Sequence, residues 1–252
     1  MTDKKKNTYF ASDFHLGVPD YASSRKREDK IVEWLNSIQN HLKELYLLGD
    51  IFDFWFEYKR VIPKGFIRIQ GKLAELSDSG VKIYLFKGNH DLWMKDYFIK
   101  ELNIEIIDEP LFKTIGEKKF YIAHGDGLGP GDIGFKFIKR IFIGKLNMWL
   151  FRWIHPDAGI KLANFFSGKS RMKNSIMDDT FLAEDEFLVQ HARKVIENND
   201  VDFLLFGHRH FPITYKLNDK STYVNLGDMI THNTYAVFDG NELELKTFEP
   251  NT

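Results

Sequence analysis

Five short polar motifs each stand directly after an apolar, strand-like run in this sequence of 252 residues. They are Asp13-Phe-His15, Gly49-Asp50-Ile-Phe-Asp53, Gly88-Asn89-His90-Asp91, His124-Gly-Asp126 and Gly207-His208-Arg-His210. The side chains they offer are carboxylates, imidazoles and one amide, a donor set that suits Mn²⁺, Fe²⁺ or Zn²⁺. The sequence contains no cysteine, so disulfides and thiolate ligands are excluded.

Seven of these side chains are metal-ligand types, enough for two cations if one carboxylate is shared. They are Asp13, His15, Asp50, Asn89, His124, His208 and His210. Two ions about 3.5–4 Å apart form the clamp used for in-line displacement at phosphorus, with a hydroxide between them as the nucleophile. The competing interpretation is that these residues cap helices and fill polar turns. It leaves unexplained why five of the nine histidines fall inside the motifs.

The elements that must position the motifs alternate between short apolar runs and segments with helical periodicity. Strands are expected at 9–12, 45–48, 81–86, 120–123, 201–206, 223–226, 235–238 and 243–248, and helical faces at 31–38 and 66–76. This alternation predicts an α/β fold in which helices cover sheet faces. The carboxyl ends of parallel strands meet at one sheet edge, so distant motifs can share one site.

One region, residues 128–190, has no strand signal and is helical and rich in aromatic residues. We interpret it as a helical lid inserted between two core strands. The predicted core then comprises residues 1–127 and 191–252.

The five motifs, taken in this order, resemble those of the calcineurin-like metallophosphoesterases. The resemblance implies a four-layer αββα sandwich with a dinuclear site. It also implies that Asp50 is the shared ligand. His90 would lie near the substrate phosphate, as an electrostatic stabiliser or proton donor, so Asp50, Asn89 and His90 are the expected catalytic residues.

Three further aspartates of the motifs, Asp53, Asp91 and Asp126, are expected beside the ligands. A histidine that binds a metal usually donates its other ring N–H to a carboxylate or carbonyl. Stabilisation of turns by Asx-type hydrogen bonds is an equally good explanation for each of them.

The insert supplies the clue to the substrate. Residues 135–155 contain five lysines and arginines, no acidic residue, and many Trp, Phe and Ile side chains. Such a segment is typical of one that lies on anionic lipid, or of a groove that holds acyl chains. The alternative is a helical hairpin whose apolar faces pack against each other. Residues 167–175 also gather cations and hydroxyls suited to phosphate oxygens.

These features resemble one branch of the superfamily, the UDP-2,3-diacylglucosamine hydrolases of lipid A synthesis. The resemblance implies attack of water on the α-phosphate of a UDP-linked diacylated glucosamine, which releases UMP and 2,3-diacylglucosamine 1-phosphate. Two divalent ions, expected to be Mn²⁺, would be the cofactors. The branch's best-known members carry Arg where this chain has His90. The residues that could bind substrate are Asp132, Phe135, Lys169 and Arg171.

Other functions fit the sequence less well. The formal net charge of −1 argues against a nucleic acid partner, and no obligate protein partner is implied. A metallophosphoesterase that acts on another nucleotide, a dinucleotide polyphosphate or a phosphoprotein would not need a lid that is both apolar and basic. A non-catalytic scaffold of the same fold would lack some of the metal ligands, whereas all the expected ligands are present in this sequence. Without a signal peptide or membrane span, the expected location is cytoplasmic, peripheral to the inner membrane.

Overall fold

The computed structural model describes residues 6–130, 133–163 and 181–250. The first of its two sheets has the strand order β11-β10-β1-β2-β3-β4. Its strands are β1 (Asn7–Ala11), β2 (Leu42–Leu47), β3 (Lys82–Phe86), β4 (Glu105–Ile107), β10 (Thr234–Phe238) and β11 (Leu243–Thr247). Strands β1 to β4 are parallel to one another, whereas β10 and β11 close one side of the sheet as an antiparallel pair.

The second sheet has the order β5-β6-β7-β9-β8, with β6, β7 and β9 parallel at its centre. Its strands are β5 (Leu111–Ile115), β6 (Lys118–Ala123), β7 (Phe203–Phe206), β8 (Pro212–Lys216) and β9 (Thr222–Leu226). The edge strands β5 and β8 pair antiparallel with their neighbours. Both are absent from the sequence prediction, as is the three-residue β4, although the edge strand β11, which mixes polar and apolar residues in the same way, is included in it.

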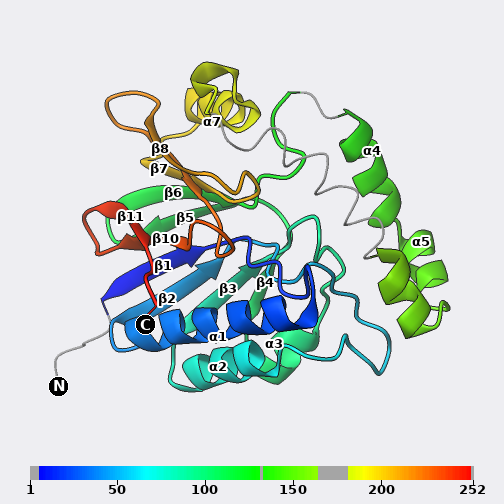
Figure 1. The fold of residues 1–252 in the computed structure, drawn as a ribbon. Coiled ribbons are helices and arrows are strands. Elements are labelled where there is room, and N and C mark those ends of the chain that lie inside the picture. The colour runs from blue at the N-terminus through cyan, green and yellow to red at the C-terminus, as the bar shows by residue number, and fades with distance from the viewer. Residues whose placement is uncertain (1–5, 131–132, 164–180, 251–252) are drawn as a thin grey trace.

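The helices form the two outer layers of the sandwich (Figure 1). Helices α1 (Tyr21–Ile38), α2 (Ile67–Asp78) and α3 (Tyr97–Leu102) cover the outer face of the first sheet, and α7 (Phe187–Asn198) covers the second. Each layer boundary is filled by its own cluster of buried apolar side chains. The expected four-layer αββα fold is therefore confirmed.

Alternation along the central strands supplies these clusters. Phe10, Tyr46 and Tyr84 are paired across β1, β2 and β3, and all three point between the two sheets. Their rings stack with centroid separations of 5.0 Å and 4.4 Å. Because the neighbouring residues Tyr9 and Leu45 pack against the helices instead, these strands are buried on both faces. That two-sided burial fixes the strand ends from which the motifs leave.

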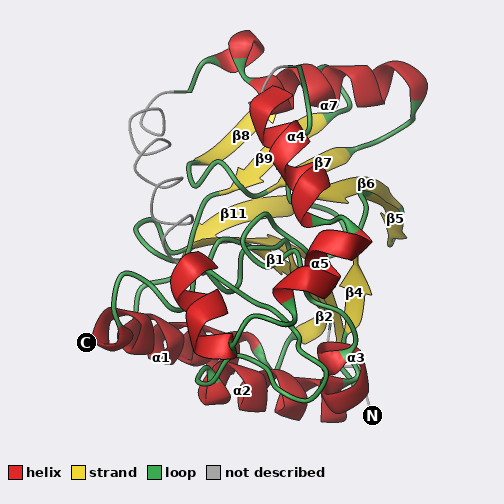
Figure 2. Cartoon of the chain, turned by 90° about the vertical axis from the view of Figure 1, so that its right-hand side faces the viewer, coloured by secondary structure: helices red, strands yellow, loops and turns green. Residues whose placement is uncertain are grey.

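The insert follows β6 and contains α4 (Ile133–Phe142) and α5 (Lys145–Phe151), after which residues 156–163 are helical. Figure 2 shows these helices in front of the strand ends, outside the four layers. A short 3-10 helix, η1 (Ala183–Asp185), leads into α7. The predicted lid boundary at residue 190 falls inside α7, whose Leu188 and Val189 are buried against the second sheet.

Candidate metal centre

The five motifs leave the carboxyl ends of parallel strands at one edge of the sandwich. Asp13 and His15 follow β1, Asp50 follows β2, and Asn89 follows β3. In the second sheet, His124 follows β6, and His208 and His210 follow β7. The two sheets meet here directly, because the backbone N–H of His208 donates to Asp13 Oδ2 over 3.0 Å.

The loops that carry these residues adopt unusual backbone conformations. Five of the predicted ligands have a positive φ, between 42° and 66°. They are Asp13, His15, Asp50, His208 and His210. A left-handed conformation at a residue other than glycine costs on the order of 1–3 kcal/mol and persists only where its surroundings enforce it. Their concentration at one edge indicates that the geometry of this site is maintained at the expense of stability.

A first group of donors is formed by Asp13, His15 and His210, whose ligand atoms all lie within 4.8 Å of one another. The Nε2 atoms of the two imidazoles are 3.2 Å apart, and His210 Nε2 lies 3.3 Å from Asp13 Oδ1. This Asp13 oxygen is buried without a hydrogen-bond partner. A buried, unsatisfied carboxylate oxygen facing two ring nitrogens is the arrangement that a divalent cation would satisfy.

A second group is formed by Asp50, His124 and His208. Asp50 Oδ2 lies 3.4 Å from His124 Nε2 and also 3.6 Å from His15 Nε2 of the first group. The carboxylate of Asp50 thus stands between the two groups. The amide oxygen of Asn89 completes this side, 3.4 Å from His124 Nε2. Seven oxygen and nitrogen donors are therefore collected, which is a donor set that fits divalent cations.

The imidazole rings are oriented by contacts at Nδ1, the ring nitrogen that does not face the other donors. His124 Nδ1 donates to the carbonyl oxygen of Leu48 over 2.6 Å, so in the neutral ring the lone pair is on the Nε2 atom that faces Asp50. His15 Nδ1 lies 3.3 Å from Asp53 Oδ1, and His90 Nδ1 lies 3.1 Å from the carbonyl oxygen of Asp53. Asp53 thus contacts the rings of both His15 and His90.

The other two motif aspartates have different partners. Asp91 accepts the backbone N–H of Gly88 over 2.7 Å and that of Ile51 over 2.9 Å, so it connects the loops after β3 and β2. This is the turn-stabilising alternative. Asp126 accepts a hydrogen bond from Lys139 of α4 over 2.5 Å and so links the core to the insert.

The close spacing of charges shifts several pKa values. Burial alone would lower the pKa of His15, but the neighbouring carboxylates of Asp13 and Asp53 raise it to about 10. His124 shows the same balance, in which burial is outweighed by the Asp50 carboxylate, and its pKa is also raised to about 10. Burial and the neighbouring charge of His124 lower the pKa of His208 to about 4. Before a cation binds, two of the imidazoles are thus protonated at neutral pH and one is not.

Two glycines allow the loops to approach the ligands. A Cβ atom on Gly88 would lie 2.1 Å from Asp50 Oδ1, and one on Gly207 would lie 2.7 Å from Asp13 Oδ2. Any other residue at either position would displace a carboxylate. The glycines of the G-N-H-D and G-H-x-H motifs are therefore needed for close packing, and neither of them has a positive φ.

The predicted substrate-binding residues have no described side chains. Asp132, Lys169 and Arg171 lie outside the described residues. The backbone of Phe135 belongs to α4, but its side chain is not described. These four assignments remain predictions.

One residue of the site, Asp228, is missing from the sequence prediction. Its Oδ2 lies 3.5 Å from His210 Nδ1, and its side chain is buried. It follows β9 as Leu226-Gly227-Asp228, the same order of strand, glycine and aspartate that Leu48-Gly49-Asp50 shows after β2. That repeated pattern is the signal that would have identified it.

The insert is attached beside the site by aromatic contacts. The ring of Phe151 lies 4.8 Å from Phe56 and 4.9 Å from Trp93, between centroids, and 6.3 Å from Phe54. Trp93 Nε1 also donates to the carbonyl oxygen of Phe142 at the end of α4 over 2.9 Å. Trp93 belongs to the same loop as Asn89 and His90, so one loop contacts both the donors and the lid.

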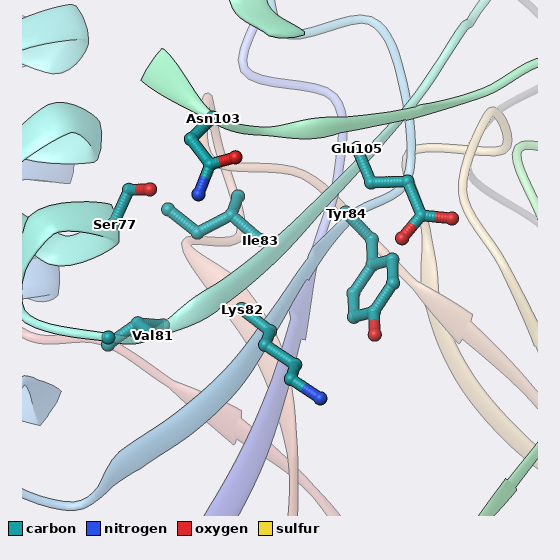
Figure 3. Close-up of a pocket in the computed structure, with 8 residues that line it drawn as sticks. Ser77, Val81, Lys82, Ile83, Tyr84, Asn103 and Glu105 are labelled. Atoms are coloured by element: carbon teal, nitrogen blue, oxygen red, sulfur yellow. The ribbon is translucent and has the colours of Figure 1, made fainter.

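A separate cavity of about 330 Å³ lies at the other end of β3. Figure 3 shows its lining, which includes Lys82, Tyr84 and Glu105. These residues lie at the starts of β3 and β4, whereas Asn89 follows the end of β3. The cavity is therefore not part of the donor cluster.

Comparison with known proteins identifies the family. The family model for calcineurin-like phosphoesterases matches residues 7–212. A UDP-2,3-diacylglucosamine hydrolase of Porphyromonas gingivalis is 37% identical over 97% of this chain and 98% of its own length. A protein of the same name from Pseudomonas entomophila is 30% identical over 94% of this chain and 97% of its own length. One from Vibrio parahaemolyticus is 25% identical over 97% of this chain and 99% of its own length. The chain belongs to the calcineurin-like phosphoesterase family.

Proposed function

We infer that this phosphoesterase hydrolyses UDP-2,3-diacylglucosamine at its α-phosphate, giving UMP and 2,3-diacylglucosamine 1-phosphate. The observation that carries the proposal is the match, over nearly the whole chain, to relatives that bear the name of this activity. A match that includes the insert matters because a phosphoesterase core by itself leaves the substrate open. In the reaction, water adds to the α-phosphorus and the bond to the bridging diphosphate oxygen breaks.

Two divalent cations, expected to be Mn²⁺, would be held by the two donor groups. Asp13, His15 and His210 would hold one, and Asn89, His124 and His208 would hold the other. The distances of 3.6 Å to His15 and 3.4 Å to His124 support Asp50 as the ligand common to both. Such a pair of cations supplies an activated water and stabilises charge on the phosphoryl oxygens.

The chain's own residues then orient the reacting groups. His90 is fixed at one ring nitrogen, since its Nδ1 donates to the carbonyl oxygen of Asp53, and its backbone N–H donates to Asp50 Oδ1 over 2.9 Å. In this tautomer the lone pair is on Nε2, where a proton can be exchanged with the substrate phosphate. Burial lowers the pKa of His90, so the ring is neutral before the substrate binds and would have to take up a proton at Nε2 to act as the proton donor.

Residues 128–190 would act as a lid that receives the acyl chains and contacts an anionic membrane. The apolar side chains of Leu146, Trp149 and Trp153 are 67%, 53% and 76% exposed. The exposed cations Lys145 and Arg152 lie on the same segment. Exposed apolar and basic side chains together favour binding at an anionic lipid interface. Among the described residues, each helix is too short or too polar to cross a bilayer, so such contact would be peripheral.

The direct test is release of UMP from UDP-2,3-diacylglucosamine in detergent micelles with added Mn²⁺. The matched control substrate is UDP-glucose, which has the same diphosphate linkage but no acyl chains. We expect UMP from the lipid and little from the control. Rapid cleavage of UDP-glucose, or of a dinucleotide polyphosphate, with no reaction of the lipid would overturn the substrate assignment and leave the phosphoesterase assignment intact.

A further inference from the structure

Asp228 is placed to orient a predicted metal ligand from outside the five motifs. The residue is 3% exposed and lies in the turn after β9. Its Oδ1 accepts the backbone N–H groups of Ile230, Thr231 and His232 at 3.0, 2.8 and 2.9 Å. Its Oδ2 is directed elsewhere, 3.5 Å from His210 Nδ1. One carboxylate oxygen thus holds the turn, while the other faces the candidate site.

We propose that Asp228 is a positioning residue, which accepts the Nδ1 proton of His210 and thereby presents the Nε2 lone pair to a cation. The proposal rests on the proposed function, in which His210 is a ligand. It follows from the geometry of the ring, since His210 Nε2 on the opposite side lies 3.3 Å from Asp13 Oδ1. An acceptor at Nδ1 fixes both the tautomer and the ring plane.

The neighbouring imidazoles show the same arrangement. His124 Nδ1 has the Leu48 carbonyl oxygen, and His15 Nδ1 has Asp53 Oδ1. His210 obtains its acceptor from the turn after β9 instead. His210 is also the more exposed ligand, with 27% of its side chain accessible against 2% for His15, so packing restrains it less. A dedicated acceptor therefore has more effect on His210 than on the buried histidines.

The turn that carries Asp228 is itself constrained. The backbone N–H of Thr234 donates to the Asp228 carbonyl oxygen over 3.0 Å. A Cβ atom on Gly227 would lie 2.3 Å from Thr234 Oγ1, so this approach requires glycine. His232 Nδ1 lies 3.6 Å from the same Asp228 oxygen but is buried without a hydrogen-bond partner. A variant of His232 therefore tests which of the two imidazoles donates to Asp228.

The test is the variant Asp228→Asn, measured by calorimetric titration of the metal-free full-length chain with Mn²⁺. The asparagine Oδ1 can still accept the three backbone N–H groups, so the turn is kept. Its Nδ2 donates and cannot accept the His210 proton. We expect the affinity of one of the two Mn²⁺ sites to fall about ten- to a hundredfold, the usual effect of losing such a partner. The melting temperature of the metal-free protein should stay unchanged.

Two variants serve as matched controls. Asp239→Asn alters an aspartate whose Oδ1 accepts the N–H groups of Asn241 and Glu242 at 2.8 and 2.9 Å in a turn between β10 and β11. His232→Gln removes the other imidazole near Asp228. Both should bind Mn²⁺ like the unmodified chain.

The outcomes separate the two proposals. If the unmodified chain fails to bind two Mn²⁺ ions, the proposed dinuclear function fails. If it binds two and Asp228→Asn binds them equally well, the positioning role is wrong. An affinity loss accompanied by a lower melting temperature of the metal-free variant would also overturn it, because Asp228 would then be needed only for the turn.

Discussion

The edge that carries the donors and the insert beside it are built in opposite ways. At the edge, Asp13, His15, Asp50 and His124 are each no more than 4% exposed, and hydrogen bonds between loops fix their positions. In the insert, α5 fully buries none of its residues, and its Leu146, Trp149 and Leu150 side chains are exposed, whereas Phe151 packs on Phe56 and Trp93. The donor edge is held in place by packing and hydrogen bonds within the core. The described part of the insert leaves several large apolar side chains exposed to solvent.

This difference separates the two tasks of the molecule. Positive φ values and an unsatisfied Asp13 oxygen are unfavourable in an empty site and become useful when a cation binds. Exposure of Trp149 and Trp153 is unfavourable in water, and under the proposed function it would be useful on a lipid surface. Under the proposed function, the core would supply the chemistry and the insert would select the substrate; Asp126–Lys139 and Trp93–Phe151 are among the contacts that join them.

The largest effect is expected from a variant that disables the donor edge and leaves the insert unchanged. Asp50→Asn keeps the shape and an acceptor for the His90 N–H but removes the charge between the two donor groups. We expect UMP release to fall by about three orders of magnitude, or about 4 kcal/mol in the barrier. Bound Mn²⁺, measured by elemental analysis, should fall with it. Vesicle binding should not change.

The control for this variant is Asp219→Asn, at an exposed position in the turn between β8 and β9. It should match the unmodified chain in all three measurements. If Asp50→Asn retained full metal content and activity, Asp50 would not be the shared ligand.

The second expectation concerns pH. The folded pKa values of His15 and His124 are raised to about 10, above the ordinary histidine value, so their protons must leave when a cation binds. Release of two protons makes Mn²⁺ affinity rise by up to about a hundredfold per pH unit. Titrations at pH 6.5, 7.0 and 7.5 in buffers of different ionisation enthalpy measure both quantities.

The stability of the metal-free protein should change with pH in the opposite direction from the Mn²⁺ affinity. Because these folded pKa values are raised, the stability that the charged imidazoles contribute is present below about pH 6.5 and is lost as pH rises toward 10. Raising the pH should therefore lower the melting temperature of the metal-free protein while it strengthens metal binding. Affinity that is independent of pH would contradict the proposed protonation states.

Much of the edge could be predicted from sequence. Strand, glycine and ligand follow one another within a few residues, so local patterns reveal them, and parallel strands bring their ends together. The sequence also predicted the strands that carry Asp13, Asp50 and His124. It missed Asp228, whose role depends on a contact with His210 that only the pairing of β7 with β9 brings about.

For the insert, the sequence predicted helical structure and residue composition but not how the helices pack on the core. Its composition indicates helices with apolar and basic faces, and α4 and α5 are present. Its attachment depends on Phe56, Trp93 and Phe151, which are separated by up to 95 positions in the sequence. Because no period or spacing encodes such contacts, the sequence alone could not show where the lid packs.

Removing the exposed tryptophans should disable the insert and spare the edge. The double variant Trp149→Ser, Trp153→Ser loses two rings that lie 6.0 Å apart. We expect binding to anionic phosphatidylglycerol vesicles to weaken roughly thirtyfold, from about 2 kcal/mol of lost apolar burial. Sedimentation with vesicles measures it.

The control pair is Tyr21→Ser with Ile67→Ser, since these side chains are 81% and 73% exposed on the first turns of α1 and α2, which are not part of the insert. It should leave vesicle binding unchanged. Equal losses for both pairs would mean that general surface hydrophobicity, and not the insert, directs the chain to lipid.

The smallest expected effect tests the attachment between the two regions. Phe151→Ala removes the ring that packs on Phe56 and Trp93. The lid is then no longer held in a fixed position against the loop that carries Asn89 and His90. We expect KM for the diacylated substrate to rise about tenfold, or about 1.4 kcal/mol, while hydrolysis of bis(p-nitrophenyl) phosphate is unchanged. Phe112→Ala, at a 53% exposed ring on β5, is the matched control. If Phe151→Ala slowed both substrates equally, the aromatic contact would be supporting the donor edge itself, and the separation of chemistry from substrate selection would not hold.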